Sequence, residues 1–190
     1  MTLLSKLEYS NSPSDVWGYA NVDGEYALLG LYDGISIVNI TNPSEPFELE
    51  FFPGPESVWR DLKTWQNYLY CVNETSGGLQ IINLTELIDD AENTTYIENI
   101  DLGFTTAHNI FVDSNGVLYV FGSNYGMGGC IMYDLTVDPE NPIMLGVFDA
   151  YYFHDGMVRG DTLWGGAIYN GVFSVIDVSD KTNPQNNFSE

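Results

Sequence analysis

Three short polar segments hold the side chains best suited to chemistry in this chain. They are Arg60-Asp61, His108-Asn109 and His154-Asp155, and the last two contain both histidines of the 190-residue sequence. Imidazole and carboxylate groups are ligands that suit Zn²⁺ and similar divalent ions. The same groups can act as acid and base on a substrate. If the fold brings the segments together, all six residues are candidate binding residues, and the candidate metal ligands are His108, His154, Asp61 and Asp155.

Other interpretations of these polar residues stay open. The six could instead hydrogen-bond neighbouring strands, with Arg60 neutralising Asp61 or Asp155. The segment Asp113-Ser114-Asn115-Gly116 resembles part of a Ca²⁺ loop but lacks the remaining ligands, so a plain turn is the better prediction. The sequence leaves the cofactor undefined, with a divalent metal, Zn²⁺ or Ca²⁺, as the one to consider.

A repeated pattern must position these side chains. A turn-forming pair followed by an apolar run and an Asn or Asp occurs four times, at Asp33–Ile40, Gly77–Leu84, Gly128–Leu135 and Asn170–Val178. Taking Asn39, Asn83, Asp134 and Asp177 as equivalent, the copies are separated by 44, 51 and 43 residues. A period of this length is typical of one supersecondary unit that is stacked or arranged radially.

Each repeat is predicted to contain four short antiparallel strands and no long helix, which is the signature of a β-propeller blade. We expect an all-β protein with about four blades, at residues 15–55, 56–101, 102–150 and 151–190. The first strand of each blade should line the central channel. The three polar segments fall at equivalent places in successive repeats, near that first strand. They should therefore converge near one axis.

Local signals add detail to this prediction. Asp33-Gly34 predicts a hairpin turn of type I′. Asn39 and Asn83 begin N-x-Thr sequons, but Asp occupies the same place in the other repeats, so a turn or strand-end role is predicted. Leu84–Ala91 is expected to contain a short helical turn.

The ends of the chain bear on whether the ring closes. Residues 1–14 precede the first repeat, and Leu3–Tyr9 is expected to form a strand. The last repeat stops where the first repeat has its full outer strand. Two alternatives stay open: Leu3–Tyr9 could supply that strand and close a four-bladed ring, or the chain is an incomplete piece of a larger propeller.

Composition excludes several classes of partner. The chain has 27 acidic and 5 basic residues and a net charge of −22, so nucleic acid is not an expected partner. No apolar run is long enough for a transmembrane segment, and the first ten residues lack the features of a secretory signal.

Cys71 and Cys130 match no zinc spacing and are predicted to be buried free thiols, or a disulfide if their strands adjoin.

Several ordered motifs resemble a known family. Tyr26–Gly30 together with Asp33–Ile40 is similar to the LVIVD repeat of bacterial surface proteins. More narrowly, a series of motifs resembles, in order, the choice-of-anchor B family: Trp17-Gly18-Tyr19, Trp59–Leu62, Gly78-Leu79-Gln80, Ala107–Ile110 and His154-Asp155. The resemblance implies a secreted bacterial protein held at the cell surface by a sorting signal. Family members continue past Asn183-Pro184, and they tend to have His where this chain has Cys130.

Two functions follow as hypotheses. The first is a secreted or cell-surface propeller that acts as a binding or scaffold module for a protein or glycan, with a metal at the channel mouth. Trp17, Trp59, Trp65 and Trp164 could stack on sugars, although packing between blades is their default role. The alternative is a metal-dependent hydrolase or lyase that uses the His/Asp cluster. No phosphate loop or hydrolase motif is present, which favours the first.

Overall fold

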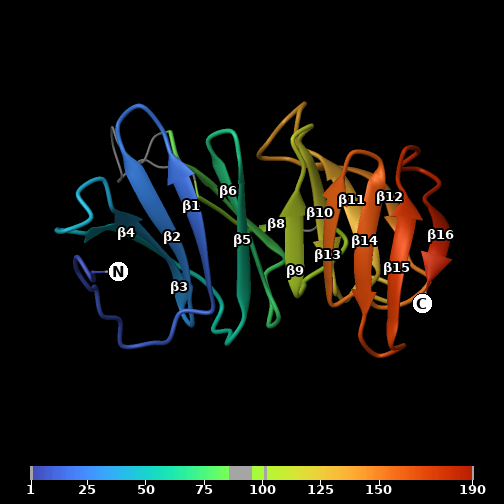
Figure 1. The fold of residues 1–190 in the computed structure, drawn as a ribbon, viewed down its shortest axis with the longest axis horizontal. Helices are drawn as coiled ribbons and strands as arrows, with labels where there is room; N and C mark the ends of the chain where they lie inside the picture. Colours follow the sequence, from blue (N-terminus) through green and yellow to red (C-terminus); the bar gives the residue numbers. More distant parts are fainter. Residues whose placement is uncertain (1, 86–95, 101, 190) are drawn as a thin grey trace.

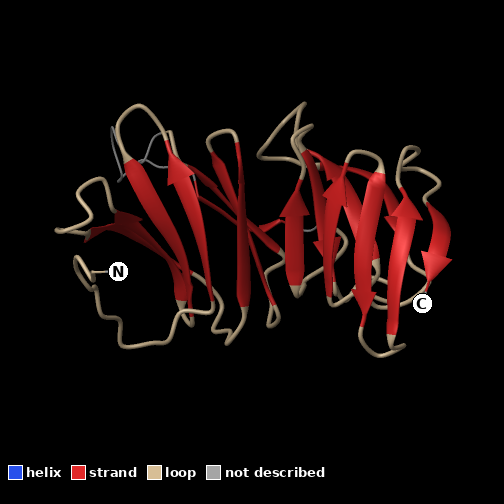
Figure 2. Cartoon of the chain, in the orientation of Figure 1, coloured by secondary structure: helices blue, strands red, loops and turns tan. Residues whose placement is uncertain are grey.

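The computed structural model describes residues 2–85, 96–100 and 102–189. Within them the chain forms strands and loops and no helix (Figure 2). The strands make four antiparallel four-stranded sheets, each built from four consecutive strands in chain order. The prediction of an all-β propeller with about four blades is therefore confirmed. We call the sheets blades 1 to 4.

The strands are as follows. Blade 1 contains β1 (Asp15–Ala20), β2 (Glu25–Leu31), β3 (Gly34–Asn39) and β4 (Phe47–Pro53). Blade 2 contains β5 (Arg60–Trp65), β6 (Tyr68–Asn73), β7 (Leu79–Asn83) and β8 (Tyr96–Ile100). Blade 3 contains β9 (Asn109–Val112), β10 (Val117–Phe121), β11 (Cys130–Asp134) and β12 (Ile143–Phe148). Blade 4 contains β13 (Asp155–Arg159), β14 (Thr162–Ala167), β15 (Val172–Asp177) and β16 (Gln185–Ser189).

The first strands of the blades lie beside one another. β1 contacts β5, β5 contacts β9, and β9 contacts β13, so these four strands form the inner side of the array. Figure 1 shows the blades following one another in an open arc, with blade 1 at one end and blade 4 at the other. The expected closure into a four-bladed ring is therefore not present in the described part of the chain.

The hydrophobic core consists of layers between successive blades. Because side chains alternate along a strand, each blade has two faces. Leu28 and Ile35 of blade 1 share a buried cluster with Leu69 and Ile82 of blade 2. Equivalent clusters join blades 2 and 3 and blades 3 and 4. We call the face toward the following blade the front face and the opposite one the back face.

A side-chain turn ends the third strand of every blade. The Oδ1 atom of Asn39, Asn83, Asp134 or Asp177 accepts a hydrogen bond from the backbone N–H two residues later, at 3.0, 3.0, 2.7 and 2.9 Å. Asn and Asp favour such turns because their short side chains reach this N–H. The predicted turn role of this repeat position is confirmed.

Two local predictions need correction or fall outside the described residues. The β2–β3 loop is Tyr32-Asp33, because Leu31 already pairs with Gly34. A type I′ turn needs positive φ at both central residues, and neither has it, so that prediction is wrong. The predicted helical turn over Leu84–Ala91 lies mostly outside the described residues.

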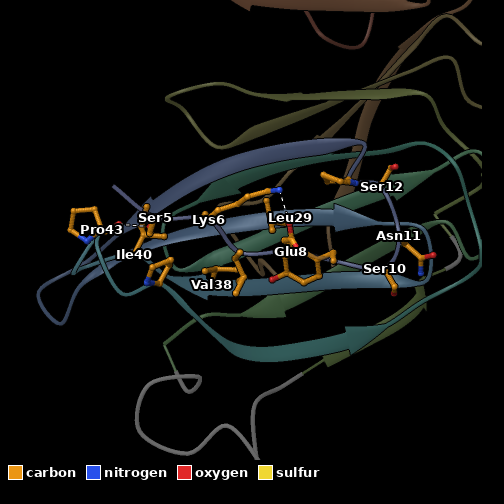
Figure 3. Close-up of a pocket in the computed structure, with 15 residues that line it drawn as sticks. Ser5, Lys6, Glu8, Ser10, Asn11, Ser12, Leu29, Val38, Ile40 and Pro43 are labelled. Atoms are coloured by element: carbon orange, nitrogen blue, oxygen red, sulfur yellow. Dashed lines mark hydrogen bonds and ion pairs between the residues drawn. The ribbon is translucent and has the colours of Figure 1, made fainter. Parts of the chain in front are cut away.

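The N-terminal segment also differs from expectation. Leu3–Tyr9 forms no strand, and blade 4 has its own fourth strand, β16. Residues 5–13 instead run along the back face of blade 1, where Ser5 Oγ donates to the Pro43 carbonyl at 2.5 Å (Figure 3). The hydroxyls of Tyr9 and Ser36 lie 2.7 Å apart. We call residues 5–13 the N-terminal strap.

Two further sequence predictions concern burial and membranes. Cys71 and Cys130 are free and buried in different blades, as expected for structural thiols. Burial raises the pKa of the Cys71 thiol to about 12, so this thiol is unreactive at neutral pH. Among the described residues there is no helix that is long and apolar enough to span a bilayer.

Candidate metal centre

The predicted site residues occupy equivalent positions on the inner strands. Asp15, Asp61, Asn109 and Asp155 pair with Gly30, Val72, Phe121 and Gly166 on the second strands, in the same register in each blade. Asp15 therefore belongs to the same series, although sequence reasoning did not select it. The residue before each position is Ser14, Arg60, His108 or His154. Because the first strands of successive blades contact one another, the residues at these equivalent positions lie side by side along the inner side of the array.

Three of the predicted metal ligands form one cluster. His108, His154 and Asp155 each offer a ligand atom within 4.8 Å of the others. The two imidazole rings have centroids 3.8 Å apart, and Nδ1 of His154 lies 2.5 Å from Oδ2 of Asp155. Two imidazoles and one carboxylate are the kind of ligand set that Zn²⁺ takes in proteins. His108 belongs to blade 3 and the other two to blade 4, so the cluster joins these blades.

His108 is fixed by contacts on three sides. Nδ1 lies 2.7 Å from Oε1 of Glu74, and the ring of Trp59 stacks on the imidazole with centroids 4.7 Å apart. The Trp59 indole N–H donates to the His108 carbonyl at 2.7 Å. Gly122 packs so closely that an added Cβ would lie 2.8 Å from the His108 Cβ. These contacts hold the ring in one orientation.

The other ring nitrogen of His108 has no partner. A carboxylate only accepts hydrogen bonds, so the contact with Glu74 places a proton on Nδ1 and leaves Nε2 as a lone-pair donor. Nε2 is buried without a hydrogen-bond partner in the described structure. A buried polar atom without a partner is costly, and such atoms indicate an absent ligand or a functional role.

Exposure increases across the cluster. The side chains of His108, His154 and Asp155 are 8%, 33% and 61% exposed. A bound ion would therefore be held from the protein side by His108 and would face solvent on the side of Asp155. Such an ion could keep a coordination position for a group from outside, as catalytic and ligand-binding zinc sites do.

Asp61 is not part of this cluster. Its Oδ2 accepts the Ile110 backbone N–H and the Asn109 side-chain N–H, each at 2.7 Å. Its Oδ1 accepts from Lys63 Nζ at 2.7 Å. Burial raises the pKa of Asp61 to about 6, although the Lys63 charge and the Ile110 N–H act against this rise. Both oxygens of the carboxylate thus accept hydrogen bonds within the protein, and the assignment of Asp61 as a metal ligand stays a prediction.

The role of Asp61 recurs from blade to blade. Oδ2 of Asp15 accepts the Leu62 N–H of blade 2 at 2.9 Å, and Oδ1 of Asn109 accepts the Gly156 N–H of blade 4 at 3.5 Å. In each case the side-chain oxygen accepts the backbone N–H of the residue that directly follows the equivalent position on the next blade. We call these contacts the axial bridges. They explain why Asp or Asn occupies this position in blades 1, 2 and 3.

Arg60 is likewise structural. It is fully buried, and its guanidinium donates to the Leu31 carbonyl at 2.6 Å and to Gln80 Oε1 at 3.0 Å, with further bonds to the carbonyls of Tyr32 and Pro55. It therefore ties blade 2 to the end of blade 1. Lys63, rather than Arg60, neutralises Asp61.

The tryptophans divide between packing and exposure. Trp17 Nε1 donates to Thr64 Oγ1 at 3.0 Å, across the junction of blades 1 and 2. Trp65 packs on the cluster between blades 2 and 3. Trp164 lines an open groove on the front face of blade 4. Packing between blades is thus the role of Trp17 and Trp65.

Sequence reasoning missed Glu74, which orients His108. Glu74 follows β6 on a loop and has no fixed relation to the inner strands, so no spacing rule selects it. Only the fold brings it beside His108, 34 residues further along the chain.

A comparison with family models identifies the repeat. The model of the LVIVD repeat matches residues 15–52 and 167–189, which lie in blades 1 and 4. The chain thus contains LVIVD-repeat sequence at these two places, in a fold built of propeller-type blades. The matched residues cover the strands of blade 1 and the strands β15 and β16 of blade 4, and the cluster of His108, His154 and Asp155 lies outside them. A comparison with curated proteins gave no match.

Solved structures with similar folds support the same architecture. The periplasmic gluconolactonase PpgL of Pseudomonas aeruginosa superimposes with a TM-score of 0.66 at 11% identity, covering 94% of this chain and 54% of that one. The N-terminal domain of Nup159 gives a TM-score of 0.57 at 12% identity, covering 92% of this chain and 48% of that one. This chain thus spans about half the length of these proteins. At such identities the likeness concerns the fold alone.

Proposed function

We propose that the protein is an extracellular or cell-surface binding module that holds a divalent metal ion, Zn²⁺ by its ligand chemistry, between blades 3 and 4. The ligands are His108, His154 and Asp155. The observation that carries the proposal is the buried, unpartnered Nε2 of His108 beside a second imidazole and a carboxylate. Ca²⁺ prefers oxygen ligands, so the two imidazoles favour Zn²⁺ over Ca²⁺.

The partner in this proposal is a surface protein or glycan with an oxygen or nitrogen donor. The exposed side of the cluster lets such a group complete the coordination of the ion. The location is supported by the LVIVD repeat and by the periplasmic source of one structural neighbour. Membership of the choice-of-anchor B family is part of the proposal and is supported by the ordered sequence motifs.

The geometry favours binding over the alternative of a metal-dependent hydrolase or lyase. That alternative used Asp61 together with Asp155 near the metal. Asp61 instead accepts hydrogen bonds from the backbone of blade 3 and from Lys63, so it is not available as a ligand or base.

The test compares two pairs of variants in protein purified without chelator. Metal content is measured by mass spectrometry, and Zn²⁺ and Ca²⁺ are then titrated into metal-free protein by calorimetry. We expect one Zn²⁺ per chain and at least a tenfold loss of affinity in His108→Ala and His154→Ala.

Asp155→Asn and Asp61→Asn form the matched control pair. The first should weaken Zn²⁺ binding, and the second should leave it unchanged, because only Asp155 belongs to the cluster. Equal metal content in the wild type and both histidine variants would rule out the site.

A further inference from the structure

Two tyrosines of blade 4 contact each other near the proposed metal centre. Tyr152 lies two residues before His154, and Tyr169 lies on the loop between β14 and β15, at the end of these strands. Their ring centroids are 4.9 Å apart, and the ring planes are tilted by 41°. Tyr152 is partly buried, whereas Tyr169 is 76% exposed. The pair therefore presents one ring to the protein and one ring to solvent.

Tyr152 lies beside the metal cluster, on the side of blade 3. A Cβ added to Gly122 would lie 2.8 Å from the Tyr152 hydroxyl oxygen and 2.8 Å from the His108 Cβ, so these two atoms approach the same point. Burial raises the pKa of the Tyr152 phenol, and the charges of Glu74 and Asp155 add to this rise. The phenol is thus a neighbour of His108 and of both carboxylates at the site.

The Tyr152 hydroxyl is available to a ligand. Within residues 2–85, 96–100 and 102–189 it has no hydrogen-bond partner, whereas the hydroxyl of the neighbouring Tyr151 bonds to Ser174. A phenol hydroxyl can donate one hydrogen bond and can also accept one. A polar group bound next to the cluster can therefore use it as donor or acceptor.

The loop between β10 and β11 fixes the position of Tyr152. Gly122 and Gly128 have φ of 61° and 78°, a region that favours glycine, and both pack directly against Tyr152. A Cβ added to Gly128 would lie 2.8 Å from Cδ2 of the tyrosine ring. The Phe153 N–H donates to the Gly128 carbonyl at 3.0 Å, which ties the segment after Tyr152 to the same loop. A side chain that is held in place before binding loses little freedom when a ligand binds.

Charge at the site favours a neutral ligand. The side chains of Glu74 and Asp155 are 45% and 61% exposed, and in the described part of the chain each pairs with a histidine and neither with Lys or Arg. These two carboxylates would balance the charge of a divalent ion. Because the whole chain carries a net charge of −22, an anionic ligand would be repelled. A neutral polyol can donate its hydroxyl hydrogens to the carboxylates.

We infer that the partner of the metal centre is a neutral glycan, one sugar ring of which stacks on Tyr169 while its hydroxyls bind the ion and the Tyr152 hydroxyl. The inference rests on the proposed function, because the ion is one of these contacts. An exposed aromatic ring with polar groups beside it suits a sugar, which has an apolar C–H face and a rim of hydroxyls. One ring is enough to hold one sugar, whereas a stable protein interface needs about 800 Å² on each partner.

A glycan array that displays neutral and acidic glycans tests the inference with the zinc-loaded full chain. We expect binding to neutral glycans and not to acidic ones. Calorimetry with the array glycan that binds best should show about a tenfold loss of affinity in Tyr169→Ala. Tyr152→Phe removes one hydrogen bond and keeps the ring, so the loss should be about threefold to tenfold. Removal of zinc with a chelator should also weaken glycan binding, because the sugar then loses the ion.

Tyr169→Phe and Phe47→Ala are the control variants. Tyr169→Phe keeps an aromatic ring and should bind the glycan more tightly than Tyr169→Ala. Phe47 is 52% exposed on β4 of blade 1, at the other end of the arc from the cluster (Figure 1), so its replacement should not change glycan binding. Circular dichroism confirms that each variant is folded. Zinc titration of Tyr169→Ala should match the wild type, because Tyr169 contacts only the sugar.

The outcomes separate this inference from the proposed function. Zinc binding without binding to any neutral glycan on the array would overturn the inference and leave the metal centre standing. A wild type that binds no zinc would overturn the proposed function itself. Glycan binding that the chelator or Tyr169→Ala leaves unchanged would contradict the inference. Binding to acidic glycans alone, or to surface proteins freed of their glycans, would contradict it as well.

Discussion

Nδ1 of His108 lies 2.7 Å from Oε1 of Glu74, and this contact decides which side of the imidazole is free. The carboxylate holds the proton on Nδ1, so Nε2 is available as a ligand. A carboxylate behind a histidine also fixes the orientation of the ring, as in many zinc sites. Glu74 is therefore a positioning residue for the proposed metal centre.

Glu74→Gln should reduce the Zn²⁺ affinity by about 10–100-fold, the usual effect of losing such a partner. Calorimetric titration of metal-free protein measures it. Glu56→Gln is the matched control. Glu56 is also exposed, but its carboxylate accepts a hydrogen bond from the Tyr32 hydroxyl instead of contacting His108. An equal affinity in both variants would show that Glu74 does not act on the site.

Arg60→Lys should destabilise the fold although the charge is kept. Lysine cannot replace the forked guanidinium contacts with Leu31 and Gln80, and its ammonium would be buried with fewer partners. We expect a loss of about 3 kcal/mol in the free energy of unfolding, in the range seen when a buried charge loses its partners. Urea denaturation measures this loss. Arg159→Lys, on an exposed position, should change little, and similar losses in both variants would contradict the prediction.

Asp134 provides a test of the turn that ends each third strand. Asp134→Ala should lower the free energy of unfolding by about 1 kcal/mol, because Oδ1 accepts hydrogen bonds from the N–H and hydroxyl of Thr136. Asp134→Asn should be close to the wild type, since Asn39 and Asn83 do the same in blades 1 and 2. Thermal unfolding distinguishes the two. Equal losses would show that charge, and not the turn, matters there.

Asp61 should make stability depend on pH. Its pKa rises from 3.8 to about 6 on folding, so the folded protein binds a proton that the unfolded chain has released. This contribution to stability is fully present below about pH 4 and is lost as the pH rises through about 6. The cost of Asp61→Asn should therefore be smaller at pH 7 than at pH 4.5, by about 1–2 kcal/mol. Urea denaturation at both pH values measures the difference, and a cost independent of pH would contradict it.

The repeat pattern predicted much of the fold, for a physical reason. Turn residues and alternating apolar positions act locally, so they identified the second and third strands around Asn39 and Asp177 without any knowledge of packing. The strand expected over Leu3–Tyr9 was wrong, because apolar residues such as Leu7 can lie across a sheet face without pairing with it. The type I′ turn was wrong because Gly34 begins the strand.

The site could be predicted only in part. The register of the repeats brought His108 and His154 together, as equivalent positions on neighbouring blades must be. The same register could not tell Asp61 from Asp155. That difference depends on whether a following blade offers a backbone N–H to the carboxylate, as Ile110 does for Asp61. Glu74 needed the three-dimensional structure.

The junction between blades 3 and 4 has a kinetic consequence. In an array where each unit contacts mainly its neighbours, a blade that is packed on one face opens more readily than a blade that is packed on both. In the described structure β14 and β15 border an open groove, whereas β6 and β10 lie between two core layers. Amides of β14 and β15 should thus exchange with deuterium before those of β6 and β10. His108 and His154 lie on opposite sides of this junction, so an ion held by both would slow that opening and protect blade 4 selectively. The deuterium exchange rates of the amides throughout blade 4 would then report whether an ion occupies the site between His108 and His154.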